Sequence, residues 1–217
     1  MKYEAVIFDW DGTLVDSTGR IVEAMQLASA DAGMTKLSDF DIKQIIGLGL
    51  PEAICELWPK LEQDVSTLNE MRRLYNLHYM SDLRSVMTFY DHAENLLTGL
   101  LRANLDIAVA TGKSRQGLDR AFREFKIGHM FRDSRCADET KSKPHPLMLE
   151  ELSSSLGVDP SAMVMIGDTE FDLKMANAAG IDGVAITHGA HDEKKLKACN
   201  PVMVVDSLKE LHNWLLN

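Results

Sequence analysis

Short, continuously apolar runs alternate with helical segments along most of this 217-residue chain, and this alternation most narrows the folds open to it. Each run is apolar on successive residues rather than on every second one, which is typical of strands covered on both faces. The runs are Ala5–Phe8, Leu105–Ala110, Ala162–Ile166, Val184–Ile186 and Val202–Val205. Alternation of strands with helices predicts an α/β fold, a Rossmann-like parallel sheet with helices on both faces.

One segment, residues 17–83, interrupts the alternation because it contains no convincing strand. Its first part places apolar residues at spacings of 4, 3 and 4, which is one face of a helix: Ile21, Met25, Ala28 and Ala32. Pro51 suits the first turn of another helix, and Asp64–Met80 reads as a longer one. We therefore predict a small all-helical cap domain at 17–83, inserted into an α/β core of residues 1–16 and 84–217, with hinges near Asp16–Thr18 and Leu83–Val86.

Charge and cysteine content limit the partners and the compartment. The formal net charge is −10, and an acidic chain repels nucleic acid and anionic membranes at long range, so we expect neither as a partner. No apolar run approaches the roughly 20 residues of a membrane helix. The three cysteines are odd in number and far apart, which indicates no disulfide framework and fits the cytoplasm. We expect a monomer or a homodimer.

Residues suited to phosphate and metal chemistry follow several of the predicted strands. Ligands of parallel sheets bind at the carboxyl ends of the strands, so the residues after each apolar run are the candidates. These candidates are Asp9, Asp11, Gly12, Thr111, Gly112, Lys113, Lys143, Asp168 and Asp172. Four carboxylates would repel one another without a cation among them, and hard oxygen ligands favour Mg²⁺. Glycine turns and helix N-termini add N–H donors for a phosphate.

The four stretches that carry these residues resemble the four motifs of the haloacid dehalogenase (HAD) superfamily of phosphohydrolases. They are "FDWDGTLVDS", "VATGKS", "KPHP" and "GDTEFD", in the family's order, and they span residues 8–172. A helical insert after the first motif resembles the cap of subfamily I, which includes phosphoglycolate phosphatase and β-phosphoglucomutase. The resemblance implies a phosphoric monoester hydrolase of the HAD-like fold, with Mg²⁺ as cofactor and a small phosphorylated substrate.

The resemblance also implies three catalytic residues. Asp9 matches the nucleophile that becomes an aspartyl phosphate, and Asp11 matches the general acid/base that protonates the leaving oxygen and then activates water. Lys143 matches the lysine that bridges the phosphate and Asp9. The spacing agrees for the two acids, because residues i and i+2 of an extended chain point to the same side.

The implied binding residues fall into two sets. The substrate-binding residues would be Gly12, Thr111, Gly112 and Lys113. The metal ligands would be the carboxylate of Asp9, the backbone carbonyl of Asp11, and the carboxylates of Asp168 and Asp172. Because residues i and i+4 share one face of a helix, we expect Asp168 and Asp172 to converge on one metal.

Some polar residues are interpreted as structural. His188 and His191 of "THGAHD" could suggest a metal pair, but they lie in a glycine-containing loop, and we expect them at the surface. Lys141 is expected to be solvated rather than functional.

Alternative functions remain open at the level of sequence. A phosphosugar mutase of the β-phosphoglucomutase type would share every core motif, but the cap loop Gly47–Glu52 contains no Arg or Lys for a second phosphate or for the carboxylate of phosphoglycolate. Arg20, Lys43 and Arg84 could supply that cation if the fold brings them near. A dehalogenase is disfavoured by Asp11. A catalytically silent HAD-like domain that binds proteins is disfavoured by the retained acids.

Overall fold

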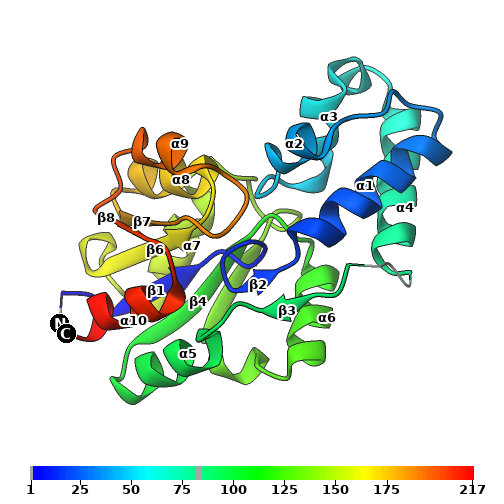
Figure 1. The fold of residues 1–217 in the computed structure, drawn as a ribbon. Helices are drawn as coiled ribbons and strands as arrows, with labels where there is room; N and C mark the ends of the chain where they lie inside the picture. The colour runs from blue at the N-terminus through cyan, green and yellow to red at the C-terminus, as the bar shows by residue number, and fades with distance from the viewer. Residues whose placement is uncertain (1, 82–84) are drawn as a thin grey trace.

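The protein consists of an α/β body and a helical cap that lies to one side of it (Figure 1). The computed structural model describes residues 2–81 and 85–217. Leu83 of the predicted hinge and the candidate cation Arg84 lie outside these ranges.

A six-stranded parallel sheet forms the centre of the body, in the order β5-β4-β1-β6-β7-β8. The strands are β1 (Ala5–Phe8), β4 (Asp106–Thr111), β5 (Asp133–Cys136), β6 (Met163–Gly167), β7 (Asp182–Ile186) and β8 (Met203–Val205). The chain begins in the middle at β1, builds outward through β4 and β5, and then returns to the other side of β1 at β6. The strand order therefore reverses at β1, and such a switch point is where ligands of open α/β sheets bind.

Helices cover both faces of the sheet, as predicted, because successive strand residues point to opposite sides. Phe8, Val109 and Ile166 pack on one face against α5 (Ala93–Arg102), α6 (Arg115–Phe125) and α10 (Leu208–Leu216). Ile7, Ala108 and Met165 pack on the other face against α7 (Leu147–Leu156) and α8 (Glu170–Ala179), and α9 (Glu193–Lys197) lies beyond α8. Among the described residues, no helix combines the length and the apolar character needed to cross a membrane.

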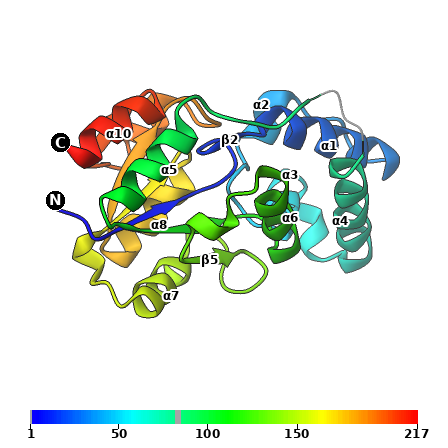
Figure 2. The same ribbon diagram turned by 90° about the horizontal axis from the view of Figure 1, so that it is seen from below.

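Four helices follow β1 in the sequence and share an apolar core of their own. They are α1 (Thr18–Asp31), α2 (Asp39–Lys43), α3 (Leu50–Leu57) and α4 (Val65–Tyr79), joined in part by a 3₁₀ turn at Pro59–Glu62. Met25, Ile54 and Met71 lie in the centre of this apolar core, which is separate from the two clusters on the sheet. Figures 1 and 2 both place these helices together at one end of the body.

The junction between the cap and the body includes a short antiparallel pair. β2 (Val15–Asp16) leads out to the cap and pairs with β3 (Thr88–Phe89), which leads back. The pairing ties the two connections together, so the cap is attached through both of its ends.

Strand β5 carries no sequence pattern that predicts it. Its residues, Asp-Ser-Arg-Cys, form no apolar run, because β5 is the edge strand beyond β4 and is covered less completely than the central strands. An edge strand can be polar, and its existence depends on pairing with β4 rather than on its own composition.

Candidate active site

The predicted residues gather at the carboxyl ends of β1, β4 and β6, at the switch point of the sheet. Asp9 follows β1, Thr111 ends β4 and Asp168 follows β6. Lys143 reaches the same place from the loop before α7, and it is 1% exposed despite its charge. Segments far apart in the sequence thus form one buried polar centre.

Three of the four predicted acids form a cluster that fits a metal ion. Asp9, Asp168 and Asp172 are each at most 1% exposed, and one carboxylate oxygen from each lies within 4.8 Å of the other two. Oδ2 of Asp9 is buried and has no hydrogen-bond partner among the residues that the structure describes. A buried oxygen without a donor is costly, so the donor set fits a hard cation such as Mg²⁺.

Burial and mutual repulsion dominate the electrostatics of this cluster. Burial, opposed by Lys143 and reinforced by Asp172, raises the pKa of Asp9 well above its usual range. Burial and the Asp172 carboxylate raise the pKa of Asp168 to about 7. Both raised pKa values mean that the ionised form of each acid is disfavoured unless a cation lies beside it.

Lys143 supplies part of that compensation. Its Nζ donates to Asp9 Oδ1 at 2.7 Å and to Asp172 Oδ1 at 2.6 Å. Burial alone would lower the pKa of Lys143, but the carboxylates of Asp172 and Asp9 raise it above the usual value. The lysine therefore stays charged and holds one oxygen of Asp9, which leaves Oδ2 as the oxygen open to chemistry.

Asp168 is held by neighbours that the sequence analysis did not single out. Its Oδ1 accepts from Thr13 Oγ1 at 2.8 Å, and its Oδ2 accepts from the Ala190 N–H at 2.7 Å. A Cβ on Gly12 would lie 2.3 Å from Asp168 Oδ2, and Gly12 has φ +84°. The Gly12 N–H donates to Val15 O, and the absence of a side chain makes room for Asp168; a contact of Gly12 with the substrate stays a prediction.

Asp172 reaches the cluster in a different way from the one expected. Asp168 precedes α8, so the two acids do not share a helical face. Asp172 is the third residue of α8 and forms a capping box: its Oδ2 accepts from the Thr169 N–H, and the Thr169 hydroxyl accepts from the Asp172 N–H. The capping box, rather than i,i+4 spacing, turns Oδ1 of Asp172 toward Lys143.

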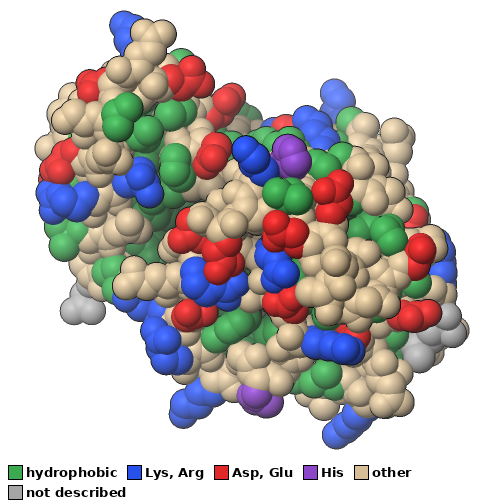
Figure 3. Space-filling view, turned by 180° about the vertical axis from the view of Figure 1, so that it is seen from behind, with side chains coloured by type: hydrophobic (Ala, Val, Ile, Leu, Met, Phe, Trp, Pro, Cys, Tyr) green, Lys and Arg blue, Asp and Glu red, His purple; other side chains and the backbone are tan. Residues whose placement is uncertain are grey.

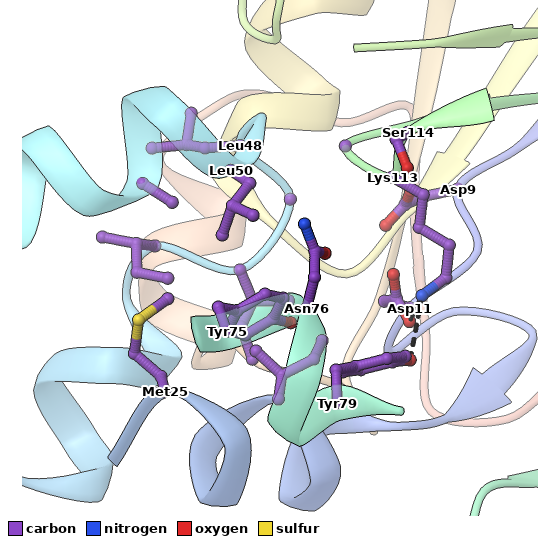
Figure 4. A pocket seen from close by; sticks show the side chains of 16 residues that line it. Asp9, Asp11, Met25, Leu48, Leu50, Tyr75, Asn76, Tyr79, Lys113 and Ser114 are labelled. Carbon is purple, nitrogen blue, oxygen red and sulfur yellow. Dashed lines mark hydrogen bonds and ion pairs between the residues drawn. The ribbon is translucent and has the colours of Figure 1, made fainter. Parts of the chain in front are cut away.

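Asp11 faces the cavity but stands apart from the three clustered acids. Its Oδ1 lies 2.9 Å from Lys113 Nζ and accepts from Ser17 Oγ at 2.5 Å. Lys113 Nζ also donates to the hydroxyl of the cap residue Tyr79 at 3.0 Å, as Figure 4 shows. Burial would lower the pKa of Lys113, but Asp11 and its other neighbours raise it, so a charged lysine holds Asp11 in place.

A cavity of about 110 Å³ lies between these core residues and the cap (Figure 4). The core contributes Asp9, Asp11, Gly112, Lys113 and Ser114 to its lining. Ser114 is also the N-cap residue of α6, so this helix begins at the cavity. Thr111 does not belong to this lining; it is fully buried, and its Oγ1 accepts from the Lys113 N–H, so it shapes the turn beneath the site.

The loop between α2 and α3 closes over the phosphate-binding turn predicted at Gly112. A Cβ on Gly112 would lie 2.4 Å from the backbone oxygen of Leu48 and 2.7 Å from that of Gly47. The same loop is pinned to the body by Ser142, whose Oγ accepts from the Gly49 N–H at 2.8 Å. Gly112 is therefore required by the closed position of the cap, in addition to any contact with a ligand.

We expect Gly112→Ala to lower kcat/KM by about 100-fold, because its methyl group would push the cap backbone off the site, and misplacement by about 1 Å can cost that much. Steady-state hydrolysis of a small phosphate ester measures the effect, with circular dichroism to show that the variant is folded. Gly117→Ala is the matched control, since its Cβ would lie 3.3 Å from the flexible Ser114 hydroxyl and 3.8 Å from Lys113 Cβ, without a backbone atom in the way. Wild-type activity in Gly112→Ala would contradict the close approach.

His191 is buried, at 2% exposure, and is not the surface residue that the sequence analysis expected. Its Nδ1 accepts from the Glu170 N–H at 3.0 Å, so its Nε2 carries the proton and donates to Gln44 O of the cap at 3.2 Å. Lys195 Nζ donates to the Gln44 side chain at 3.1 Å. His191 thus joins the N-terminus of α8 to the cap, and no pattern in its loop signalled this contact. Lys141 is exposed, as expected.

A second, wider cleft of about 1,020 Å³ opens on the other side of the α2–α3 loop, where the cap and the body meet, and the surface is hollowed there (Figure 3). Its lining contains four carboxylates, Glu52, Glu56, Glu62 and Glu170, and two lysines, Lys143 and Lys195. This lining does not include Asp9, so the smaller cavity, which contains Asp9 and Asp11, is the better place for a phosphate ester.

Comparison with known proteins gives concordant results. A sequence model of the family described as haloacid dehalogenase-like hydrolase matches residues 6–186. A protein of Haemophilus influenzae named phosphoglycolate phosphatase is 27% identical over 97% of this chain and 97% of its own. A protein of Dickeya dadantii named "Probable phosphatase IndB" is 32% identical over 95% of this chain and 90% of its own. The crystal structure of a hydrolase from Pseudomonas syringae superposes with a TM-score of 0.88 at 22% identity, covering 98% of this chain and 97% of that one.

Proposed function

Because the chain belongs to the haloacid dehalogenase-like hydrolase family, we propose that it is a Mg²⁺-dependent phosphatase that hydrolyses a small phosphorylated metabolite through an aspartyl phosphate. The observation that carries the proposal is the buried, unpartnered Oδ2 of Asp9, which lies in a cluster of three acids while Lys143 occupies Oδ1. The names of the similar proteins, phosphoglycolate phosphatase among them, support a phosphatase.

In the first half of the reaction, the carboxylate of Asp9 attacks the phosphorus atom and the bond from phosphorus to the ester oxygen breaks. Lys143 holds Asp9 in position and offsets negative charge that develops on the transferred group. The leaving alkoxide takes a proton from Asp11, which Lys113 and Ser17 aim at the cavity. When bound, Mg²⁺ would be held by Asp9, Asp168 and Asp172 and would stabilise the charge on the phosphoryl oxygens.

In the second half, a water molecule attacks the phosphorus of the aspartyl phosphate and loses its proton to Asp11. The bond from phosphorus to Asp9 breaks, which restores the carboxylate and releases inorganic phosphate. Proton transfer by a positioned carboxyl group in both halves is worth roughly 10²–10⁴-fold in rate. Asp11 thus ends the cycle in the protonation state in which it began.

The two alternatives receive less support from the site. A phosphosugar mutase must bind a second phosphate in the cap, and the described cap residues that line the cavity include no Arg or Lys. A catalytically silent domain has no need for a buried cluster of repelling acids, since burial of unpaired charge lowers stability. Residues 17–83 are proposed to act as the cap that selects the substrate, in a cytoplasmic monomer or homodimer.

Removal of the metal tests this function directly. We expect EDTA to abolish hydrolysis of acetyl phosphate and Mg²⁺ to restore it, because the acids cannot bind a phosphate dianion without a cation. Mg²⁺ should also raise the melting temperature of the protein but not that of Asp168→Asn. The exposed Asp206→Asn is the control and should respond to Mg²⁺ like the wild type. Turnover that persists in EDTA would refute the metal site.

A further inference from the structure

The cap side of the cavity is apolar. Seven of its lining residues have hydrocarbon or thioether side chains: Ile21, Met25, Ile45, Ile46, Leu48, Leu50 and Ala53. They face the polar core residues across the space that the leaving group of a bound phosphate ester would occupy, as the labelled ones do in Figure 4. An apolar wall favours a leaving group with hydrocarbon surface and penalises a charge without a partner.

The polar groups that the cap adds to this cavity are uncharged. The Tyr75 hydroxyl and the Asn76 amide line the cavity, and neither has a hydrogen-bond partner among the described residues. Burial raises the pKa of Tyr75, so its hydroxyl remains neutral. These two groups can bind a hydroxyl or carbonyl oxygen of a ligand, but they offer no countercharge for an anion.

Cations near the cavity are already engaged. Lys113 is the one Lys or Arg among the described residues that line it, and its ammonium is shared between Asp11 and Tyr79. Arg20 donates to the backbone oxygens of Tyr79, Ser81 and Ser85 and does not line the cavity. Lys43 is exposed and also lies outside the lining. Neither Arg20 nor Lys43 is therefore placed to bind a second anion.

The N-terminus of α3, whose first residue Leu50 lines the cavity, is already engaged by neighbouring groups. The Gly49 N–H donates to Ser142, and Pro51 has no N–H. The Glu52 carboxylate lies so close to Gly49 that a Cβ there would be 2.5 Å from Glu52 Oε2. The partial positive charge of the helix end is thus already met by a carboxylate of the same helix.

We propose that the substrate is a phosphate monoester of a small, uncharged alcohol with an apolar face, and that an ester with a carboxylate or a second phosphate on the leaving group is excluded. The proposal rests on the phosphatase function proposed above and specifies its substrate class. It sets this chain apart from the similar proteins whose names specify phosphoglycolate, a phosphate ester that carries a carboxylate. The cavity of about 110 Å³ limits the leaving group to a few carbon atoms.

A matched pair of substrates tests the proposal. Isobutyl phosphate and 2-phosphoglycolate have leaving groups of the same branched shape, which differ in that one ends in two methyl groups and the other in a carboxylate. We expect kcat/KM for isobutyl phosphate to exceed that for 2-phosphoglycolate by about 100-fold, because the carboxylate would be buried without a partner. Equal or greater kcat/KM for 2-phosphoglycolate overturns the proposal.

Acetyl phosphate separates this proposal from the function on which it rests. If hydrolysis of acetyl phosphate does not depend on Mg²⁺ and Asp9, the phosphatase function itself fails. If acetyl phosphate is hydrolysed but isobutyl phosphate is not preferred, including the case in which neither ester is turned over, only the substrate class fails.

A positive charge introduced into the cap provides a second test of the proposed substrate class. Asn76 is exposed on α4, so Asn76→Arg leaves the packing of the cap intact while it brings a guanidinium to the cavity. We expect the ratio of kcat/KM for 2-phosphoglycolate over isobutyl phosphate to rise at least about 10-fold in this variant. Asn69→Arg, which adds the same charge at an exposed position of α4 outside the cavity lining, should leave the ratio unchanged. An unchanged ratio in Asn76→Arg would show that the missing cation does not determine selectivity.

Discussion

Asp9→Asn is expected to lower kcat by at least about 10⁴-fold while the protein remains folded, because the amide cannot attack phosphorus. The other two carboxylates of the cluster are held by protein donors, Asp168 by Thr13 and Ala190 and Asp172 by Lys143 and Thr169. The substitution also removes one of three buried carboxylates that repel one another, so we expect no loss of melting temperature. Phosphate release from acetyl phosphate with saturating Mg²⁺ measures the rate, and mass spectrometry of acid-quenched protein detects the aspartyl phosphate in the wild type alone.

Asp16→Asn provides the matched control for this experiment. Asp16 lies in the same motif, at the exposed end of β2 where the chain enters the cap, and its carboxylate accepts a hydrogen bond from Thr18 Oγ1 at 3.5 Å. This variant should keep wild-type activity. Residual turnover of Asp9→Asn above a few per cent, or phosphorylation of another residue, would be incompatible with the assignment of Asp9 as the nucleophile.

Lys143→Met is expected to impair both catalysis and stability. The methionine fills a similar volume but leaves Asp9 and Asp172 buried without their shared cation, and removal of one partner from a buried ion pair costs about 3–5 kcal/mol. Activity should fall by at least about 10³-fold, because Asp9 loses the donor that holds it and charge on the transferred phosphoryl group is no longer offset. Urea unfolding without metal measures the stability.

Lys141→Met separates this effect from a general loss of charge in the same loop. Lys141 is exposed two residues away, so its substitution should change the free energy of unfolding by no more than about 0.5 kcal/mol. Mg²⁺ should stabilise Lys143→Met by more than it stabilises the wild type, since the metal would be the remaining cation beside the acids. A Lys143→Met protein as stable as the wild type would show that the acids do not depend on this lysine.

The polar composition of the site was largely predictable, whereas its internal geometry was not. Asp9 and Asp168 follow apolar runs whose strand character is local, Lys143 precedes a helix, and parallel strands bring their carboxyl ends to one edge. The capping box that orients Asp172 and the contact of Gly12 with Asp168 depend on side-chain positions within a few ångströms. The sequence indicated only weakly that Thr13 and Ser17 contact the acids of the site, since all it shows is that both are hydroxyl residues close to the acids of the first motif.

The elements that were missed depend on contacts between distant segments. β5 is a strand because β4 offers it a hydrogen-bonding edge, and nothing in its sequence of three polar residues and one cysteine predicts this. His191 is buried because the cap loop carrying Gln44 closes on it from almost 150 residues away in the chain. Sequence periodicity reports which face of an element is apolar, but it does not report which other element will cover a polar side chain.

By itself, the sequence determined that this chain builds a parallel α/β sheet with a helical insert and collects acids, a lysine and glycine turns at one edge. Those features follow from local periodicity and from the order of the motifs. Only the tertiary structure decided that the cap loop packs on Gly112, that Lys113 is already shared by Asp11 and Tyr79, and that the cap side of the cavity is apolar. The physical reason is that the chemistry of a closed cavity depends on which side chains meet across it, and that is a property of packing between two separate cores.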